Sequence, residues 1–175
     1  MTGIFLLALK FAAEKHLTQR RKGCDVVPYI NHPIKVVNIL FHIGHETDEE
    51  LLAAAILHDV LEDTDTPELE MLELFGKRIT NLVLEVTDDM SLTYDDRKRK
   101  QIHDAPCLTE DAKKIKIADK IANIRDILDL PLTWSHRRKF QYFEWAQKVV
   151  YECRGINSDL DEAFSSIFNE AMKTI

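Results

Sequence analysis

Glycine and proline are scarce in this chain of 175 residues, with five of each, and no stretch alternates between apolar and polar residues over a useful length. Sandwiches and repeat arrays need frequent turn residues, so the shortage argues against both. With 45% hydrophobic residues, a chain of this length removes roughly 70% of its unfolded surface from water, so its core needs neither disulfides nor an oligomer. The composition therefore predicts a single all-α domain over residues 1–175.

Further absences restrict the environment and the partners of the protein. Cys24, Cys107 and Cys153 are odd in number and irregularly spaced, which favours neither a disulfide framework nor a thiolate zinc site and indicates a reducing, cytoplasmic environment. No apolar stretch reaches the about 18 residues of a membrane span, and the short run Ile4 to Leu9 lacks the flanks of a signal peptide. The net charge of −7, from 23 basic and 30 acidic residues, argues against nucleic acid as a partner, because its field repels phosphate.

Apolar spacing and capping residues predict a succession of helices. We expect them at residues 4–19, 33–43, 51–61, 67–76, 77–87, 94–103, 109–130, 134–152 and 158–173. The residues between Gly23 and Pro33 are expected to form a loop or turn. A capping box at residues 47–50 precedes the helix at 51–61, whose Ala, Ile and Leu content indicates deep burial.

This most apolar helix also carries four polar residues. His58 and Asp59 interrupt it, and Glu62 and Asp63 follow one turn later, so helical spacing places all four on one broad face. Three buried carboxylates and an imidazole repel one another and each costs several kcal/mol to remove from water, which a divalent cation would offset. Alternatively, the acidic pair lies in solvent beyond the helix end, and His58 is a satisfied core histidine.

Two other positions favour the cation. His32 stands at a helix start, and Asp119 lies in an apolar helix with Asn123 one turn later. Each alone has an ordinary explanation, as a surface histidine or as an aspartate paired with a lysine. Together with His58 and Asp59, however, they form an N2O2 ligand set that suits Mn, Fe, Zn or Mg and leaves positions for water and substrate.

The ordered pattern of His, His-Asp and Asp is the signature of the HD superfamily of metal-dependent phosphohydrolases, and the chain resembles the hydrolase domain of the RelA/SpoT alarmone enzymes. The matching blocks are KHLTQRRK at 15–22, PYINHP at 28–33, HDVLEDT at 58–64, VTDD at 86–89, RKR at 97–99 and IKIADK at 115–120. The tail YFEWA at 142–146 is similar to small stand-alone members, the metazoan SpoT homologues. The resemblance covers residues 10–170 and implies the compact multi-helix HD-domain phosphohydrolase fold.

The same resemblance implies a site. It implies Mn²⁺ as the cofactor, with His32, His58, Asp59 and Asp119 as ligands and Glu62 and Asp63 orienting or activating the attacking water. It implies substrate contacts from Arg21, Lys22, Asn123 and Tyr142. The basic run 97–100, above all Arg97 and Lys98, could approach distal phosphates of the substrate. For these substrate contacts, a helix-end basic cluster, a polar helix face, an aromatic core contact and a solvated charge run remain alternatives.

The implied substrate is the small-molecule alarmone of the stringent response, guanosine tetra- or pentaphosphate (ppGpp or pppGpp). Hydrolysis would release pyrophosphate from the 3′ position and leave GDP or GTP. A length of 175 residues leaves no room for the synthetase and regulatory domains of the long enzymes, so we expect hydrolysis without synthesis. Two alternatives stay open: a phosphatase for another nucleotide with a phosphorylated ribose, such as NADPH, and a non-catalytic nucleotide-binding module. The sequence leaves the oligomeric state open.

Overall fold

The computed structural model describes residues 3–175, so residues 1 and 2 of the predicted domain lie outside the described range. The helices are α1 (Gly3–Lys15), α2 (Asn31–His42), α3 (Glu49–Leu57), α4 (Val60–Asp63), α5 (Glu68–Val86), α6 (Tyr94–Asp104), the short 3₁₀ helix η1 (Ala105–Cys107), α7 (Glu110–Asp129), α8 (His136–Cys153) and α9 (Ser158–Met172). The strands are β1 (Arg20–Arg21) and β2 (Cys24–Pro28). The prediction of an all-α fold is confirmed, apart from this small strand pair.

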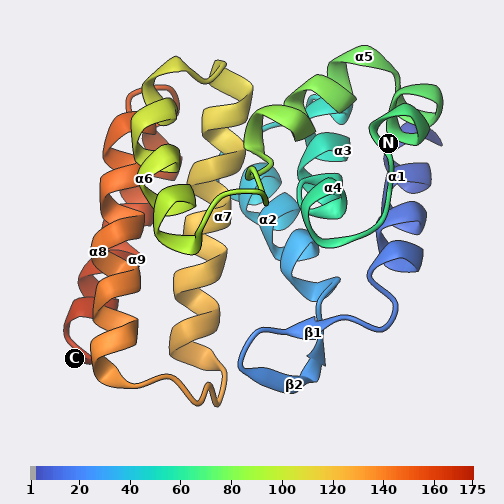
Figure 1. Cartoon of the computed structure of the whole chain (residues 1–175). Helices are drawn as coiled ribbons and strands as arrows, with labels where there is room; N and C mark the ends of the chain where they lie inside the picture. Colours follow the sequence, from blue (N-terminus) through green and yellow to red (C-terminus); the bar gives the residue numbers. More distant parts are fainter. Residues whose placement is uncertain (1–2) are drawn as a thin grey trace.

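Helix α7 forms the centre of the molecule and packs against α2, α5, α8 and α9. In Figure 1, α1, α3, α4 and α5 lie on one side of α7, and α6, α8 and α9 lie on the other. Buried residues occur on all faces of α7, although half of the residues of this helix are charged. The helix also carries the buried charged residues Lys116, Asp119, Lys120 and Asp126. Because buried charges need partners, α7 is the natural place for a polar site.

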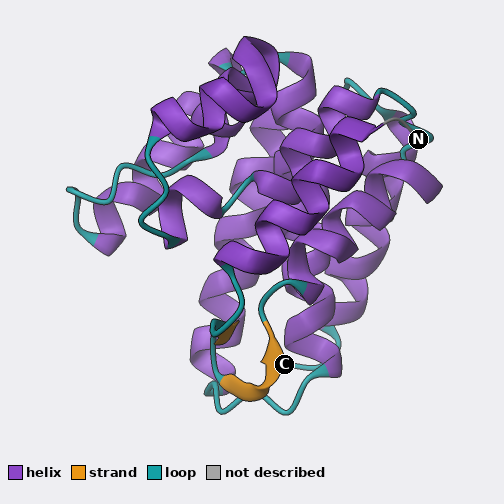
Figure 2. Ribbon diagram, turned by 90° about the vertical axis from the view of Figure 1, so that its right-hand side faces the viewer, coloured by secondary structure: helices purple, strands orange, loops and turns teal. Residues whose placement is uncertain are grey.

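The segment between α1 and α2 differs from the prediction. Helix α1 ends at Lys15 rather than near residue 19, and Arg20–Arg21 pairs with Cys24–Pro28 as an antiparallel hairpin. Gly23, at φ 86°, provides the left-handed turn between the strands. A strand of two residues is too short to show alternation, which is why the sequence pattern missed it. Figure 2 shows this hairpin in orange, below the helices.

The predicted helix at 51–61 is also wrong in one respect, because it is broken at its polar residues. Helix α3 ends at Leu57, and Asp59 has φ −102° and ψ 0°, which is outside the helical region. Helix α4 then carries Glu62 and Asp63. Active-site residues often adopt this sparsely populated backbone conformation. The four polar residues therefore do not share one regular helical face, although they remain neighbours.

The other predicted helices are confirmed to within a few residues at each end. Helix α5 covers both predicted segments, 67–76 and 77–87. The predicted boundary between them corresponds to a kink at Gly76, whose φ of 75° and ψ of 175° are not helical. The N-cap of α3 is Asp48 rather than Thr47, the first residue of the predicted capping box, and the Asp48 side chain accepts hydrogen bonds from the backbone N–H groups of Glu50 and Leu51. Within residues 3–175, no helix has the length and apolar character needed to cross a membrane.

Candidate active site

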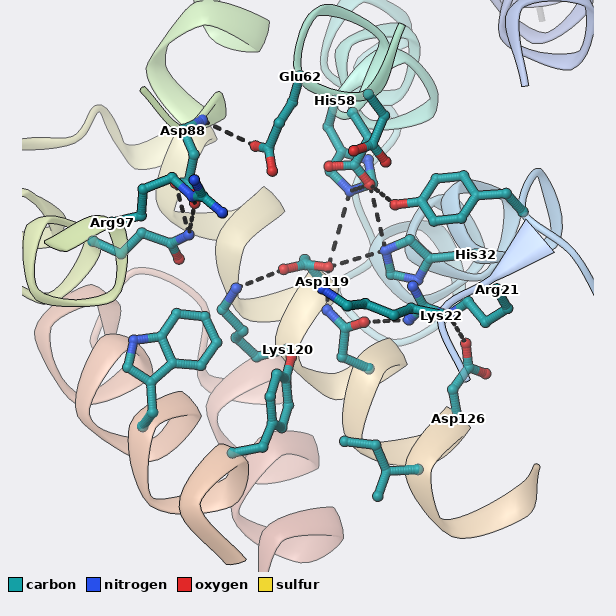
Figure 3. A pocket seen from close by; sticks show the side chains of 18 of the residues that line it. Arg21, Lys22, His32, His58, Glu62, Asp88, Arg97, Asp119, Lys120 and Asp126 are labelled. Carbon is teal, nitrogen blue, oxygen red and sulfur yellow. Dashed lines mark hydrogen bonds and ion pairs between the residues drawn. The ribbon is translucent and has the colours of Figure 1, made fainter. Parts of the chain in front are cut away.

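A cavity of about 310 Å³ opens between the hairpin, α2, α4, α6, α7 and α8. Every residue of the predicted site lines this cavity, although the residues come from segments far apart in the sequence. The predicted set comprises Arg21, Lys22, His32, His58, Asp59, Glu62, Asp63, Arg97, Lys98, Asp119, Asn123 and Tyr142. Figure 3 shows side chains from these elements converging on the cavity. The fold thus brings the whole set together.

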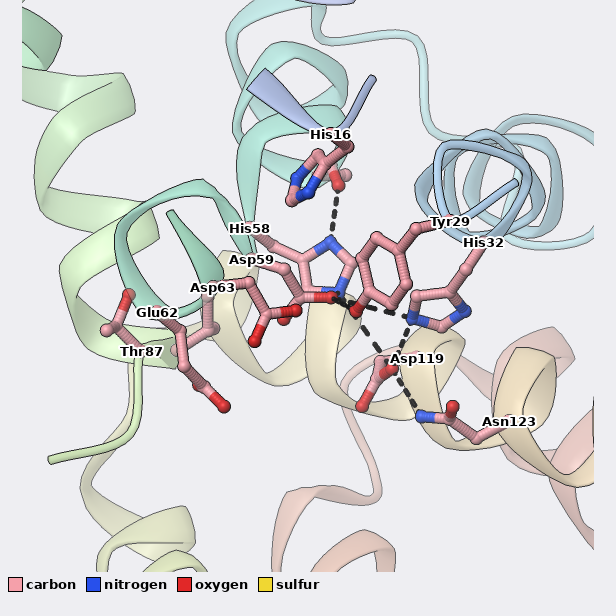
Figure 4. A network of polar contacts seen from close by, with 12 residues as sticks. His16, Tyr29, His32, His58, Asp59, Glu62, Asp63, Thr87, Asp119 and Asn123 are labelled. Atoms are coloured by element: carbon pink, nitrogen blue, oxygen red, sulfur yellow. Dashed lines mark hydrogen bonds and ion pairs between the residues drawn. The ribbon is translucent and has the colours of Figure 1, made fainter. Parts of the chain in front are cut away.

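The predicted metal ligands form what we call the metal-side wall. It consists of His32, His58, Asp59 and Asp119. Ligand atoms of the first three lie within 4.8 Å of one another. His32 Nε2 lies 3.0 Å from Asp119 Oδ1, and His58 Nε2 lies 2.8 Å from Asp59 Oδ2. All four side chains surround one small space (Figure 4).

The protonation state of His58 indicates whether the space between these four side chains favours a cation. His58 Nδ1 donates to the backbone carbonyl of Ala55 at 2.8 Å, so the lone pair of a neutral ring sits on Nε2 and faces the carboxylates. Within residues 3–175 this buried Nε2 makes no contact with hydrogen-bond geometry, although Asp59 Oδ2 lies 2.8 Å away as an ion-pair partner. Burial alone would lower the pKa of His58, but Asp59 overrides burial and raises the pKa to about 9. In the metal-free protein, a proton on His58 Nε2 therefore occupies the space between two imidazole and two carboxylate groups. The same donor set suits a divalent metal ion in place of that proton.

Neighbouring donors orient the two carboxylates of this wall. Tyr29 donates its hydroxyl to Asp59 Oδ2 at 2.5 Å. Asp119 Oδ1 accepts from Asn123 Nδ2 at 2.6 Å, and Asp119 Oδ2 accepts from Lys120 Nζ at 2.8 Å. Burial would raise the pKa of Asp119, but Lys120 and His32 hold it well below its usual range. Such partners fix a ligand's orientation before a metal binds.

Glu62 and Asp63 lie beside the metal-side wall. Glu62 Oε2 accepts the backbone N–H of Asp88 at 3.0 Å, and burial together with the charge of Asp59 raises the pKa of Glu62 to about 7. Asp63 is more exposed to solvent and accepts a hydrogen bond from Gln19 Nε2 at 2.8 Å. Partial burial and Asp59 also raise the pKa of Asp63. A carboxyl group that titrates near neutral pH suits general acid–base chemistry.

Cations line much of the rest of the cavity, and six of them form what we call the cationic wall. It consists of Arg21, Lys22, Arg97, Lys98, Lys120 and Arg138. Lys98 Nζ lies 4.8 Å from the ring centroid of Trp145 and 5.0 Å from that of Tyr94. Lys120 Nζ lies 4.5 Å from the Trp145 ring. Aromatic faces therefore hold both cations at the cavity; Lys120 is also paired with Asp119, whereas the ring contacts leave the charge of Lys98 unneutralised.

Arg21 is not part of a helix-end cluster, because it lies on β1. Its Nε donates to Asp126 Oδ2 at 2.8 Å, its guanidinium also bonds to the Asn123 side chain, and it lies over the Tyr29 ring at 5.6 Å. Its side chain is only 12% exposed. Arg21 is therefore fixed at the cavity, and Asn123 links it to Asp119.

The basic run 97–100 divides into two pairs. Lys98 faces the cavity, and Arg97 beside it donates to the carbonyl of Leu92 at 3.0 Å. Arg99 and Lys100 are exposed and form ion pairs with acidic residues of their own helix, α6. The interpretation as a solvated charge run therefore applies only to the second pair.

Several cavity residues were missed by the sequence prediction. Gln19, Tyr29, Asp88, Lys116 and Lys120 line the cavity and lie within the matching blocks, but no role was predicted for them. Trp134 and Arg138 lie outside those blocks, and the Arg138 guanidinium stacks over the Trp134 ring at 4.1 Å. Arg138 lies four residues before Tyr142 on α8, and this helical spacing is the signal that could have indicated their common face.

Comparisons with known proteins agree with this geometry. The family model described as HD domain matches residues 8–141. The chain is 45% identical over 170 residues to guanosine-3′,5′-bis(diphosphate) 3′-pyrophosphohydrolase MESH1 of Danio rerio, covering 97% of this chain and 94% of that protein. It is 48% identical over 172 residues to MESH1 of Homo sapiens, covering 97% and 96%.

A solved structure supports the same assignment at the level of the fold. It is that of a metazoan ortholog of SpoT, described as hydrolysing ppGpp, and it matches with a TM-score of 0.93 and 45% identity over 97% of this chain and 96% of the other. The class of protein is thus an HD-domain hydrolase with a site for a divalent metal. The chain belongs to the HD domain family and, within it, to the family of these MESH1 proteins.

Proposed function

We propose that this protein hydrolyses guanosine 3′,5′-bis(diphosphate) and its pentaphosphate analogue, releasing pyrophosphate from the 3′ position and leaving GDP or GTP. One observation carries the proposal: the four proposed metal ligands, the carboxyl groups of Glu62 and Asp63, and the cationic wall all line a single cavity. A metal-dependent hydrolase of a polyphosphorylated nucleotide needs these three parts together. The MESH1 relatives, which this chain matches over nearly their whole length, bear the name of this activity.

We assign Mn²⁺ to the metal-side wall, with His32, His58, Asp59 and Asp119 as its ligands. When bound there, the ion would stabilise negative charge on phosphoryl oxygens and lower the pKa of coordinated water. The mixed imidazole and carboxylate donors support a transition metal over Ca²⁺, which prefers oxygen ligands alone.

Glu62 and Asp63 supply the acid–base chemistry. Water attacks the phosphorus next to the ribose, the bond between that phosphorus and O3′ breaks, and pyrophosphate leaves with the oxygen of the water. One proton passes from the water to a carboxylate, and O3′ gains one to become a hydroxyl group. Glu62, with a pKa of about 7, can hold a proton during this exchange and return it near neutral pH.

The cationic wall binds the diphosphate groups locally, in spite of the net charge of −7. Lys98 and Lys120 lie at Trp145 with free N–H donors to offer, and a phosphate can exchange their aromatic contacts for charge-assisted hydrogen bonds. Tyr142 and Trp134 line the cavity, where their rings would contact the ribose or the base. The implied role of Arg21, stacking on the purine, agrees with its restricted side chain.

The test is turnover of defined nucleotides by the metal-stripped protein, reloaded with Mn²⁺, Mg²⁺ or Zn²⁺ in turn. We expect pyrophosphate from ppGpp, resolved by anion exchange, with Mn²⁺ giving the highest rate. Asp59→Ala should lower kcat by about 10³-fold or more and abolish Mn²⁺ binding. Asp65→Ala, an exposed acid two residues beyond α4, is the matched control and should change neither.

Parallel reactions with NADPH separate the proposal from its main alternative. Loss of the 2′-phosphate from NADPH without pyrophosphate release from ppGpp would replace the proposed substrate. Tight nucleotide binding without turnover in any metal would instead indicate a binding module. A cytoplasmic location and a single domain remain predictions.

A further inference from the structure

Two residues outside the predicted set, His16 and Gln19, form a hydrogen-bonded line that ends at Asp63. His16 Nδ1 lies 2.6 Å from Gln19 Oε1, and Gln19 Nε2 donates to Asp63 Oδ2 at 2.8 Å. His16 is 1% exposed and lies just beyond α1, whereas Asp63 ends α4 at the cavity. The line therefore joins a buried residue behind the cavity to one of the proposed acid–base groups.

The chemistry of the three groups fixes the direction of both hydrogen bonds. An ionised carboxylate only accepts, so the amide nitrogen of Gln19 must face Asp63 and its carbonyl oxygen must face His16. That oxygen also only accepts, so Nδ1 of His16 must carry the hydrogen. Rotating the Gln19 amide by half a turn would place oxygen against oxygen at Asp63. His16 thus selects the one amide orientation that donates to Asp63.

Backbone contacts hold the line in place. Gln19 N–H donates to the carbonyl of His16 at 3.1 Å, and the carbonyl of Gln19 accepts from Tyr29 N–H at 3.0 Å. The His16 ring packs against the Tyr29 ring, with centroids 5.0 Å apart. Tyr29 in turn donates to Asp59. Figure 4 shows His16, Tyr29, Asp59 and Asp63 gathered around the site. His16, Gln19 and Tyr29 therefore form one connected group. It orients Asp59, a proposed metal ligand, through Tyr29 and Asp63, a proposed acid–base group, through Gln19.

Packing alone does not account for a histidine at this position. Its Nε2 is buried and has no hydrogen-bond partner in the described part of the chain. An unpaired buried nitrogen adds to the cost of burial, so an apolar side chain of similar size would fill the space at least as well. The contact of Nδ1 with Gln19 is what a histidine provides there and an apolar side chain does not.

We propose that His16 and Gln19 are positioning residues for Asp63, and this proposal rests on the function proposed above. Gln19 engages Oδ2 of Asp63, so Oδ1 is left to face the attacking water. Without His16 the Gln19 amide can rotate, and the carboxylate loses its fixed orientation. Because His16 does not line the cavity, its loss should affect the rate of the chemical step and leave binding unchanged.

The experiment compares His16→Leu with His16→Asn. Leucine fills the space without a donor, whereas the asparagine amide places a nitrogen donor where Nδ1 stands. With ppGpp and Mn²⁺ we expect His16→Leu to lower kcat about tenfold, at unchanged KM and unchanged Mn²⁺ affinity. Losses of about this size follow when a residue that orients a site residue is removed. His16→Asn should restore most of the rate. His42→Leu, at an exposed histidine of α2, is the control and should match the parent protein.

A second readout is independent of turnover. The side-chain amide protons of Gln19, assigned by their loss in Gln19→Leu, should exchange slowly in the parent protein and in His16→Asn, and rapidly in His16→Leu. Equal kcat in parent and His16→Leu, no recovery in His16→Asn, or a parallel loss of Mn²⁺ affinity would each overturn the positioning role. If the parent protein does not cleave ppGpp, the proposed function fails, and the amide exchange still decides whether His16 orients Gln19.

Discussion

The two walls of the cavity hold their charges in different ways. In the metal-side wall, His32, His58 and Asp119 are buried, and they come from or border helices that place many other side chains in the core. The cationic wall takes most of its residues from a two-residue strand, from the start of α8 and from α6, none of whose described side chains is buried. One wall is held by the core, whereas the other is held by aromatic rings and single ion pairs.

This difference matches what each wall is proposed to do. Ligands for a metal must converge before the ion binds, and burial among packed helices fixes them at the expense of folding stability. Cations that bind phosphate must exchange partners when the substrate arrives, which weak aromatic contacts permit. We therefore expect substitutions in or beside the metal-side wall to change catalysis and stability in opposite directions, and substitutions in the cationic wall to change substrate affinity.

The largest effect is expected for Glu62→Gln, beside the metal-side wall. Loss of the acid–base group should lower kcat by about 10²- to 10⁴-fold with Mn²⁺ binding retained. In the parent enzyme, kcat should fall as the pH drops through the pKa of Glu62, which is about 7 without metal and lower once a bound cation offsets the charge of Asp59.

The same substitution should stabilise the metal-free protein. The pKa of Glu62 is raised by folding, from 4.5 to about 7, so the parent protein loses stability as the pH rises from 4.5 to 7 and does not regain it above. Glu62→Gln should therefore increase the free energy of unfolding by about 1 to 3 kcal/mol at pH 8 and by almost nothing at pH 4. Glu68→Gln, at the exposed start of α5, is the control for both measurements. An equal gain at both pH values would contradict the electrostatic explanation.

A smaller effect is expected in the cationic wall, where α6 offers a matched pair. Lys98→Ala should raise KM for ppGpp about tenfold through the loss of one charge-assisted contact. The helix should stay in place, because Trp145 Nε1 donates to the backbone carbonyl of Lys98 at 3.1 Å. Arg99→Ala removes the same charge one residue later, from a side chain 71% exposed and paired with Asp96.

Steady-state kinetics at two ionic strengths measures this difference. KM of the parent protein should rise with salt, and Lys98→Ala should reduce that dependence. Arg99→Ala should change KM by less than about twofold, because exposed ion pairs contribute little. Equal KM values for the two variants would mean that Lys98 makes no specific contact with the substrate and acts only through its contribution to the net charge of the protein.

The sequence predicted the two walls unequally for a physical reason. A buried polar residue interrupts an apolar helix, so His58, Asp59 and Asp119 could be recognised from their surroundings. The break between α3 and α4 could not, since no local pattern marks Asp59 as the residue whose backbone leaves the helical region. Lys98 and Arg99 look alike in sequence, and only the packing of α6 against Trp145 distinguishes them.

Trp134 escaped prediction because its position depends on a contact distant in sequence. It lies in the segment between α7 and α8, and a side chain at Gly23 would meet its indole, with Cβ 2.8 Å from Nε1 and 3.2 Å from Cδ1. The turn of the hairpin therefore packs directly on Trp134, which places Arg21 and Lys22 beside the α8 end of the cationic wall. No local pattern reports such a contact.

The smallest effect is expected when this contact is disturbed by Gly23→Ala. Gly155→Ala is the matched control, since both glycines have positive φ, 86° and 94°, but nothing lies within 4 Å of a Cβ at Gly155. Backbone strain alone should cost each variant about 1 kcal/mol. Gly23→Ala should lose about 1 to 2 kcal/mol more, because Trp134 has to move, and thermal unfolding should separate the two variants by about 2 to 8 °C.

The KM of Gly23→Ala for ppGpp should rise a few-fold at unchanged kcat, since the hairpin moves Arg21 and Lys22 and leaves the metal-side wall intact. A fall in kcat without a change in KM would show instead that the two walls are mechanically coupled through Tyr29, whose hydroxyl reaches Asp59 from the same hairpin.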